Sequence, residues 1–359
     1  MPEKDERRSR RYVGLAVVVL ACVACSAQSP PPTPSPIVES LNTYLDDSHR
    51  ARLPDGRMIN IVCKGEGSPT VVFTAGLGDW SVVWGQVQPR ISERTRTCAW
   101  DRPGFGFSSP SKAAQTVLTT TSDLRAALAA AGIAAPYVLV GHSFGGFETL
   151  VFTDRHRADV AGIVLVDPST PRQLERFARV LGDSSAMQRT LEAQTATIER
   201  CVDAARAGTL ATGSGDPDNC LGLNPAFPAA LTTALTQAGS DPERFVTQVS
   251  LLENVVRSNS LVADEGRNYG DLPFIVLSAS EVQAPPPSMR ELVNFDPAVL
   301  QAEMIRAHAE LARLSSRGEH QIVADTSHYI HLIRPPAVIE AIGNVLDAVV
   351  ASPLEHLER

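Results

Sequence analysis

The sequence lacks the patterns that mark several large classes of protein. Its N-terminal apolar run, Val13–Val23, is well below the ~20 residues that a helix needs to span a bilayer. It has no G-K-[ST] or G-x-G-x-x-G loop for nucleotide phosphates and no H-E-x-x-H pattern for zinc. Basic residues are not in excess, because the formal net charge is -8. We therefore expect no cofactor and no metal ion, and the charge argues against nucleic acid as a partner.

The composition is that of a folded protein. With 359 residues, 43% of them hydrophobic, the chain is long enough for one core of roughly 250 to 300 residues and an extension. No internal repeat or coiled-coil pattern is visible. The extension is expected at the N-terminus.

Residues 1–26 have the pattern of an export signal. A charged segment with two adjacent arginines, as in twin-arginine signals, precedes an apolar run and then small residues. Cys22 and Cys25 each resemble the lipidated cysteine of bacterial lipoproteins. Residues 27–40 are Pro-rich and predict a stiff linker. We expect an exported protein, either secreted or attached to the cell envelope, with membrane contact only through a lipid anchor.

Four cysteines follow this segment, and in an oxidising compartment an even number favours pairing. Cys201 and Cys220 bracket a polar loop that a disulfide would close. Cys63 and Cys98 lie in two separate strand-like runs and could pair only if those strands are neighbours.

From about residue 50, strand-like and helix-like segments alternate, which predicts an open α/β sheet with helices on both faces. One helix is expected from Ser122, as its N-cap, to a stop at Gly132, and another begins near Pro335. The expected strands are short apolar or alternating runs at residues 58–63, 70–75, 95–100, 137–141, 161–167, 273–278 and 320–325.

A long interval, residues 168–271, separates two consecutive predicted strands. Its apolar residues recur at helical spacing, so we expect a helical cap inserted over the strand ends. The core is then predicted to comprise residues 41–167 and 272–352.

The stretch VLVGHSFGG contains G-x-S-x-G between a predicted strand and a predicted helix. A sharp strand-to-helix turn leaves no room for side chains at Gly141 and Gly145, while it exposes the hydroxyl of Ser143. We therefore expect Ser143 to be a nucleophile. A serine hydroxyl needs a base, and His328, between the last strand and the final helix, is the best candidate, with His331 as its rival.

The acid that orients the base is open between two residues. Asp167 ends an apolar strand, and Glu281 follows the next predicted strand in a Pro-rich loop. We favour Asp167, because a rigid strand end holds a carboxylate more precisely than a loop does; Asp325 ranks third. The backbone N–H groups of Leu77, in the turn TAGLGDW, and of Phe144 are the expected oxyanion donors.

Five segments in this order resemble the motifs of the α/β-hydrolase superfamily over roughly residues 50–350, and more loosely the capped, exported hydrolases of actinobacteria. The segments are TVVFTAGLGDW, CAWDRPGFGFS, VLVGHSFGG, AGIVLVDPS and SHYIHLIRPP. The resemblance implies Ser143 as nucleophile, His328 as base, and Leu77 and Phe144 as oxyanion donors. It also implies that Asp101 shapes a turn and is not catalytic.

The same resemblance implies a sheet order in which the strands of Cys63 and Cys98 are adjacent, which favours that disulfide. Two departures from the family pattern stand out. Ala75 replaces the usual His of the first oxyanion motif, and the usual Asp after the strand at 273–278 is missing, with Glu281 nearest.

The sequence thus predicts a serine hydrolase that cleaves small-molecule carboxylic esters through an acyl-enzyme. Two alternatives stay open on the same fold. One is a binding protein with slow or no turnover, and the other is an aminopeptidase of the proline iminopeptidase type, for which we find no acidic site for a substrate amine.

Overall fold

The computed structural model describes the core of the chain, while the predicted signal peptide, linker and lipidation cysteines lie outside the described residues. The described residues are 41–45, 50–183, 185–210, 216, 218–282 and 296–351. None of the helices in these ranges has the length and apolar character needed to span a membrane.

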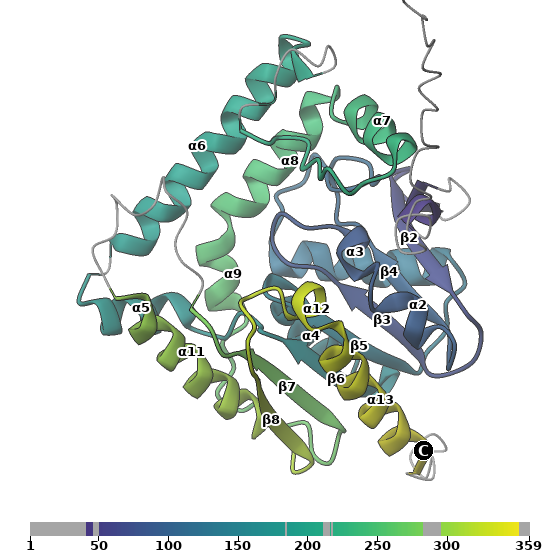
Figure 1. Cartoon of the computed structure of the whole chain (residues 1–359), viewed down its shortest axis with the longest axis vertical. Coiled ribbons are helices and arrows are strands. Elements are labelled where there is room, and N and C mark those ends of the chain that lie inside the picture. Colours follow the sequence, from purple (N-terminus) through teal and green to yellow (C-terminus); the bar gives the residue numbers. More distant parts are fainter. Residues whose placement is uncertain are drawn as a thin grey trace, which may run out of the picture. The chain divides into compact units, whose positions relative to one another are not determined.

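An eight-stranded sheet organises the described chain, with strand order β1-β2-β4-β3-β5-β6-β7-β8 (Figure 1). β1 and β4 each pair with β2 in the antiparallel sense, and all other neighbours are parallel. The predicted α/β-hydrolase fold, with its mostly parallel sheet, is confirmed. The strands are β1 (Arg50–Arg52), β2 (Met58–Lys64), β3 (Thr70–Thr74), β4 (Thr97–Trp100), β5 (Tyr137–His142), β6 (Val160–Val166), β7 (Phe274–Ala279) and β8 (Gly318–Val323).

Helices cover both faces of this sheet because its central strands are apolar on both sides. One face packs against α3 (Val117–Ala130) and α4 (Phe144–Arg155), and the other against α2 (Gln88–Ile91) and α13 (Pro335–Ala351). α13 begins at the predicted proline. The shorter helical turns are η1 (Asn42–Leu45), η3 (Ser81–Trp84), η4 (Arg157–Asp159) and α12 (Ile330–Ile333).

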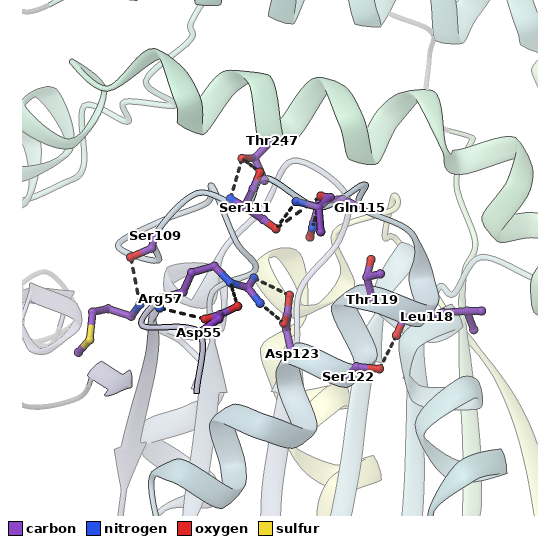
Figure 2. Close-up of polar contacts among 12 residues, drawn as sticks. Asp55, Arg57, Ser109, Ser111, Gln115, Leu118, Thr119, Ser122, Asp123 and Thr247 are labelled. Carbon is purple, nitrogen blue, oxygen red and sulfur yellow. Dashed lines mark hydrogen bonds and ion pairs between the residues drawn. The ribbon is translucent and has the colours of Figure 1, made fainter. Parts of the chain in front are cut away.

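The predicted start of α3 at Ser122 is wrong. The helix begins one and a half turns earlier, where the Thr116 side chain accepts a hydrogen bond from Thr119 N and the Thr119 side chain accepts from Thr116 N. Ser122 instead donates to Leu118 O at 2.8 Å inside the helix (Figure 2). The reciprocal cap satisfies two orphan amides, which a single serine cannot do. The helix does end before Gly132, whose φ is +64°.

Five helices, which we call the cap helices, lie between β6 and β7: α5 (Gln173–Leu181), α6 (Ala186–Arg206), α7 (Ala229–Ala238), α8 (Pro242–Glu253) and α9 (Val255–Leu261). α6 and α8 run side by side (Figure 1). They share a small apolar core that includes Val202 and Phe245. The predicted division of the chain into a core and a separate cap domain at residues 168–271 stays a prediction.

Side-chain hydrogen bonds attach α8 to the loop that follows β4. Thr247 Oγ1 accepts from Ser111 N at 3.0 Å (Figure 2). Ser250 Oγ accepts from Gln115 N at 3.1 Å. A further helix, α11 (Pro297–Ala312), lies between β7 and β8. Neither α11 nor the short strand β1 was predicted from the sequence.

Both predicted cysteine pairs are present. Cys63 of β2 lies opposite Cys98 of β4 in the antiparallel register, with 4.1 Å between their Cα atoms. Cys201 of α6 pairs with Cys220, with 5.5 Å between Cα atoms. The adjacency that the first pair requires is therefore met by the sheet order.

The Arg57 side chain joins the turn before β2 to α3, and its two carboxylate partners allow a matched test. Arg57 forms two hydrogen bonds with Asp123, at 2.6 and 2.9 Å, and one with Asp55 at 2.7 Å (Figure 2). Asp123 is 12% exposed and Asp55 53%. Because solvent screens the exposed pair, Asp123→Asn should lower the free energy of unfolding by about 1 to 3 kcal/mol, and Asp55→Asn by less than about 1 kcal/mol.

Urea unfolding of the two variants at one pH measures both values. Equal losses for the two substitutions would contradict the dependence on burial.

Candidate active site

Ser143 lies at the turn between β5 and α4 in a strained backbone conformation. Its φ of 51° and ψ of -121° are rare for a residue other than glycine and cost about 1 to 3 kcal/mol. Backbone hydrogen bonds hold the turn: Ser143 N donates to Val166 O at 3.2 Å, and Ser143 O accepts from Ser169 N at 2.9 Å. The end of β6 therefore fixes the position of this serine.

The two flanking glycines are required by space. A Cβ atom on Gly141 would lie 2.5 Å from Gly145 O, and one on Gly145 would lie 2.5 Å from Thr74 O at the end of β3. Real Cβ atoms do not approach a backbone oxygen so closely. The expected steric reason for G-x-S-x-G thus holds in the structure.

Asp167, directly after β6, forms a hydrogen bond with His328. His328 Nδ1 lies 2.7 Å from Asp167 Oδ2, and the other carboxylate oxygen accepts from Ala279 N at 2.9 Å. Burial raises the pKa of Asp167, but the hydrogen bond to His328 and the nearby His308 outweigh it, so that the net pKa lies below its ordinary value. Asp167 is therefore an ionised acceptor for His328 at neutral pH.

The other two candidate acids lie elsewhere. Glu281 is exposed, and its backbone N–H donates to Thr326 O. Asp325 is exposed and pairs with Arg334 at 2.9 Å. Among the described residues, Asp167 is the carboxylate that bonds to His328.

The buried His308 of α11 contacts the loop that follows Asp167. The sequence did not predict this residue as part of the site. His308 Nε2 lies 2.8 Å from Pro168 O, and because a carbonyl only accepts, Nε2 carries the hydrogen. His308 Nδ1 is then free to accept from Ser278 Oγ at 2.7 Å, which in turn accepts from His320 Nε2 at 2.7 Å. No motif marks His308, since α11 itself was not predicted.

His331, the rival base, is fully buried, with its ring 4.7 Å from that of Trp84. Burial and the neighbouring His328 lower its pKa to about 3. His142, also fully buried, has Nε2 3.0 Å from His328 O and thus contacts the backbone of the candidate base. Burial lowers the pKa of His142 well below its ordinary value, so that both rings are neutral packing groups near pH 7.

Arg102 orients the turn that contains Leu77. Its guanidinium donates to Gly76 O at 2.8 Å and to Ala75 O at 2.5 Å, and forms two hydrogen bonds with Glu148 of α4 at 2.6 and 2.7 Å. In a trans peptide the C=O and N–H point in opposite directions. Because Gly76 O faces Arg102, the N–H of Leu77 faces away from Arg102.

The backbone N–H groups of the two expected oxyanion donors, Leu77 and Phe144, have different surroundings. Leu77 N–H makes no hydrogen bond within the described part of the chain. Phe144 is the first residue of α4, where backbone N–H groups favour negative charge, and its ring lies against Arg102. Asp101, next to Arg102, accepts from the backbone N–H groups of Ser81 and Phe107 at 2.8 and 2.9 Å, and so binds two turns together.

Asp79, two residues beyond Leu77, is a mostly buried carboxyl without a full set of partners. Its Oδ2 has no hydrogen bond within the described residues and lies 3.9 Å from His142 Nδ1. Burial raises the pKa of Asp79 to about 6, although Arg102 and His328 act in the opposite direction. Elsewhere, no group of three or more His, Cys, Asp or Glu side chains in the described ranges could hold a metal ion.

A nucleophile-type turn after β5, with an Asp–His pair after β6 and β8, defines a hydrolase fold. Residues 69–335 match the family model described as the alpha/beta hydrolase fold. The chain belongs to this family.

Sequence relatives match only part of their own length. An uncharacterized protein of Schizosaccharomyces pombe is 43% identical over 95 residues, which are 26% of this chain and 18% of that protein. The uncharacterized YqjL of Bacillus subtilis is 34% identical over 106 residues, which are 30% of this chain and 42% of YqjL. The chain thus spans less than half the length of these relatives.

Solved structures share the fold at low identity. An esterase from Thermogutta terrifontis superposes with a TM-score of 0.52 at 18% identity, covering 84% of this chain and 98% of the esterase. The epoxide hydrolase CorEH superposes with a TM-score of 0.56 at 17% identity, covering 84% of this chain and 98% of CorEH. At such identities the likeness establishes the fold alone.

Asp79→Asn should stabilise the protein at pH 8 and change little at pH 4. Folded Asp79 has a pKa of about 6 against an ordinary 3.8, so the folded state binds this proton more tightly than the unfolded chain does. Stability from this group is therefore present below pH 4 and is lost as the pH rises through 6. At about 1.4 kcal/mol per pKa unit, the gain on substitution approaches about 3 kcal/mol above pH 7.

Urea unfolding of the variant and the parent protein at both pH values measures the difference. The same difference at pH 4 and pH 8 would contradict the raised pKa.

Proposed function

We propose that this protein is a serine hydrolase that cleaves carboxylic esters through an acyl-enzyme. The observation that carries the proposal is the hydrogen bond of 2.7 Å between Asp167 and His328, together with a strained Ser143 at the neighbouring strand end. A nucleophile, a base and an orienting acid in this arrangement are the parts that acyl transfer needs.

In the proposed first step, Ser143 Oγ attacks the ester carbonyl carbon and His328 Nε2 takes the hydroxyl proton. The carbonyl electron pair moves onto oxygen, and the N–H groups of Leu77 and Phe144 stabilise that oxyanion. As the C–O bond breaks, His328 returns the proton to the leaving alcohol. Water then repeats the sequence on the acyl-enzyme and releases the acid and free Ser143.

Each supporting group has one task in this proposal. Asp167 holds His328 in the tautomer with hydrogen on Nδ1 and stabilises the imidazolium when it forms. Arg102 acts as a positioning residue, because it holds the two carbonyls before Leu77. A Ser at position 143 argues against epoxide hydrolysis, where enzymes of this fold use an Asp nucleophile.

We further propose that the protein is exported, as a secreted protein or a lipoprotein. The two cysteine pairs at bonding distance support an oxidising compartment.

A serine-directed fluorophosphonate should label the protein, and Ser143→Ala should abolish both labelling and ester hydrolysis. The reason is that only an activated serine hydroxyl attacks phosphorus rapidly. Intact-protein mass spectrometry and hydrolysis of 4-nitrophenyl butyrate measure the two effects, with Ser169→Ala, in the neighbouring loop after β6, as a control. An unlabelled protein, or one that labels equally well as Ser143→Ala, would instead favour a binding protein.

Asp167→Asn should lower kcat by about 10⁴-fold, because an amide cannot hold the required tautomer or stabilise the imidazolium. Glu281→Gln should leave kcat within about twofold, since Glu281 is exposed. Initial rates with 4-nitrophenyl butyrate compare the two. A large loss for Glu281→Gln with little loss for Asp167→Asn would reverse the assignment of the acid.

A further inference from the structure

A cavity of about 220 Å³ lies between the cap helices and the turn that carries the proposed oxyanion donor. Its lining includes Gly78, the residue after Leu77, and both cysteines of the Cys201–Cys220 disulfide. Several of its walls are apolar. Residues from both sides line it, among them Gly78, Trp80, Phe105, Leu235, Arg244 and Phe245.

Arg244 brings a positive charge to this cavity without an ion-pair partner in the described chain. Its Nη2 donates to Gly106 O at 2.7 Å, which leaves the other donors of the guanidinium available. Burial lowers the pKa of Arg244, while Asp101 and Asp241 act more weakly in the opposite direction.

The carboxylate that lines the cavity and the two that act on the pKa of Arg244 already have other partners. Asp218 also lines it, but Arg200 holds both Asp218 oxygens at 2.7 and 2.9 Å. Asp101 accepts from the backbone N–H groups of Ser81 and Phe107, and Asp241 caps α8 by accepting from Glu243 N. The positive charge of Arg244 is therefore not neutralised by direct contact.

The position of Arg244 in α8 makes its positive charge still less favourable. α8 starts at Pro242, so Arg244 stands in the first helical turn. There the helix dipole disfavours a cation and favours an anion. A partly buried guanidinium at the positive end of a helix is stabilised when an anion enters the cavity beside it.

We propose that Arg244 binds a carboxylate of the substrate, so that the preferred substrates are esters carrying a second, ionised carboxyl group. This inference rests on the proposed ester hydrolysis at Ser143. The apolar wall formed by Trp80, Phe105 and Leu235 suits an aliphatic chain between the two groups. A single guanidinium matches the two oxygens of a carboxylate, whereas a phosphate dianion calls for more donors.

Monomethyl and dimethyl esters of glutarate, adipate and suberate test this directly, because each pair differs in one charge. The protein should hydrolyse at least one monomethyl ester with a higher kcat/KM than its dimethyl counterpart. Arg244→Met should lower kcat/KM for that monomethyl ester by about 10- to 100-fold, as for the loss of a charged hydrogen bond. The dimethyl ester should change by less than about threefold.

Two further variants separate charge from structure. Arg244→Lys keeps the charge and should restore part of the preference, while Arg206→Met, an exposed arginine of α6, should change neither rate. Equal losses for the monomethyl and dimethyl esters in Arg244→Met would assign Arg244 a structural role and overturn the proposal. So would a preference of the parent protein for every dimethyl ester, whether or not the variant folds.

A binding measurement keeps this inference distinct from the proposed function. Calorimetric titration of Ser143→Ala with monomethyl adipate should give binding that Arg244→Met in the same background weakens by at least tenfold. If the parent protein hydrolyses no ester but this binding is present, the proposed hydrolysis fails alone. If neutral esters are hydrolysed and monomethyl adipate does not bind, the carboxylate site fails alone.

Discussion

The turn after β5 packs tightly against the end of β3, and the rest of the site depends on this contact. A Cβ on Gly145 would lie 2.5 Å from Thr74 O and 2.7 Å from Ala75 O. Ala75 O is also an acceptor for Arg102, which in addition pairs with Glu148 on the helix that starts at this turn. The serine turn, the Leu77 turn and α4 therefore form one packed unit, and the buried Arg102–Glu148 pair joins its parts.

The parallel sheet brings the remaining groups to the same edge. Ser143, Asp167 and His328 follow β5, β6 and β8, and the carboxyl ends of parallel strands meet at one edge, where ligands bind in open α/β folds. Asp167 N also donates to Leu277 O of β7 at 2.8 Å, so its position depends on the neighbouring strand. The Asp167 carboxylate is held by two strands and by His308, whereas Glu281 lies on an exposed loop. This difference in rigidity explains why Asp167, and not Glu281, pairs with His328.

Local patterns were enough to predict the strands other than β1, and the serine turn. Apolar runs bounded by turn residues mark buried parallel strands, and G-x-S-x-G reflects a steric requirement within five residues. The residues that sequence reasoning missed act over long separations. Arg102 and Glu148 are 46 residues apart, and His308 reaches Pro168 across 140. Such long-range pairs leave no periodic pattern in the sequence. The start of α3 shows that an N-cap is also hard to predict when several threonines precede a serine.

The described chain leaves two charged groups poorly compensated, and both lie beside the Leu77 turn. Asp79 is a carboxyl whose pKa burial raises to about 6, and Arg244 is a cation whose contacts are with neutral groups. Folding alone selects against such groups, because burying a charge without a partner costs free energy. Asp79 reduces this cost by taking up a proton as the pH falls below about 6, whereas an arginine does not lose its proton near neutral pH. Contact with an anion would reduce this cost for Arg244, and the proposed substrate carboxylate would supply that anion in the cavity that Arg244 lines.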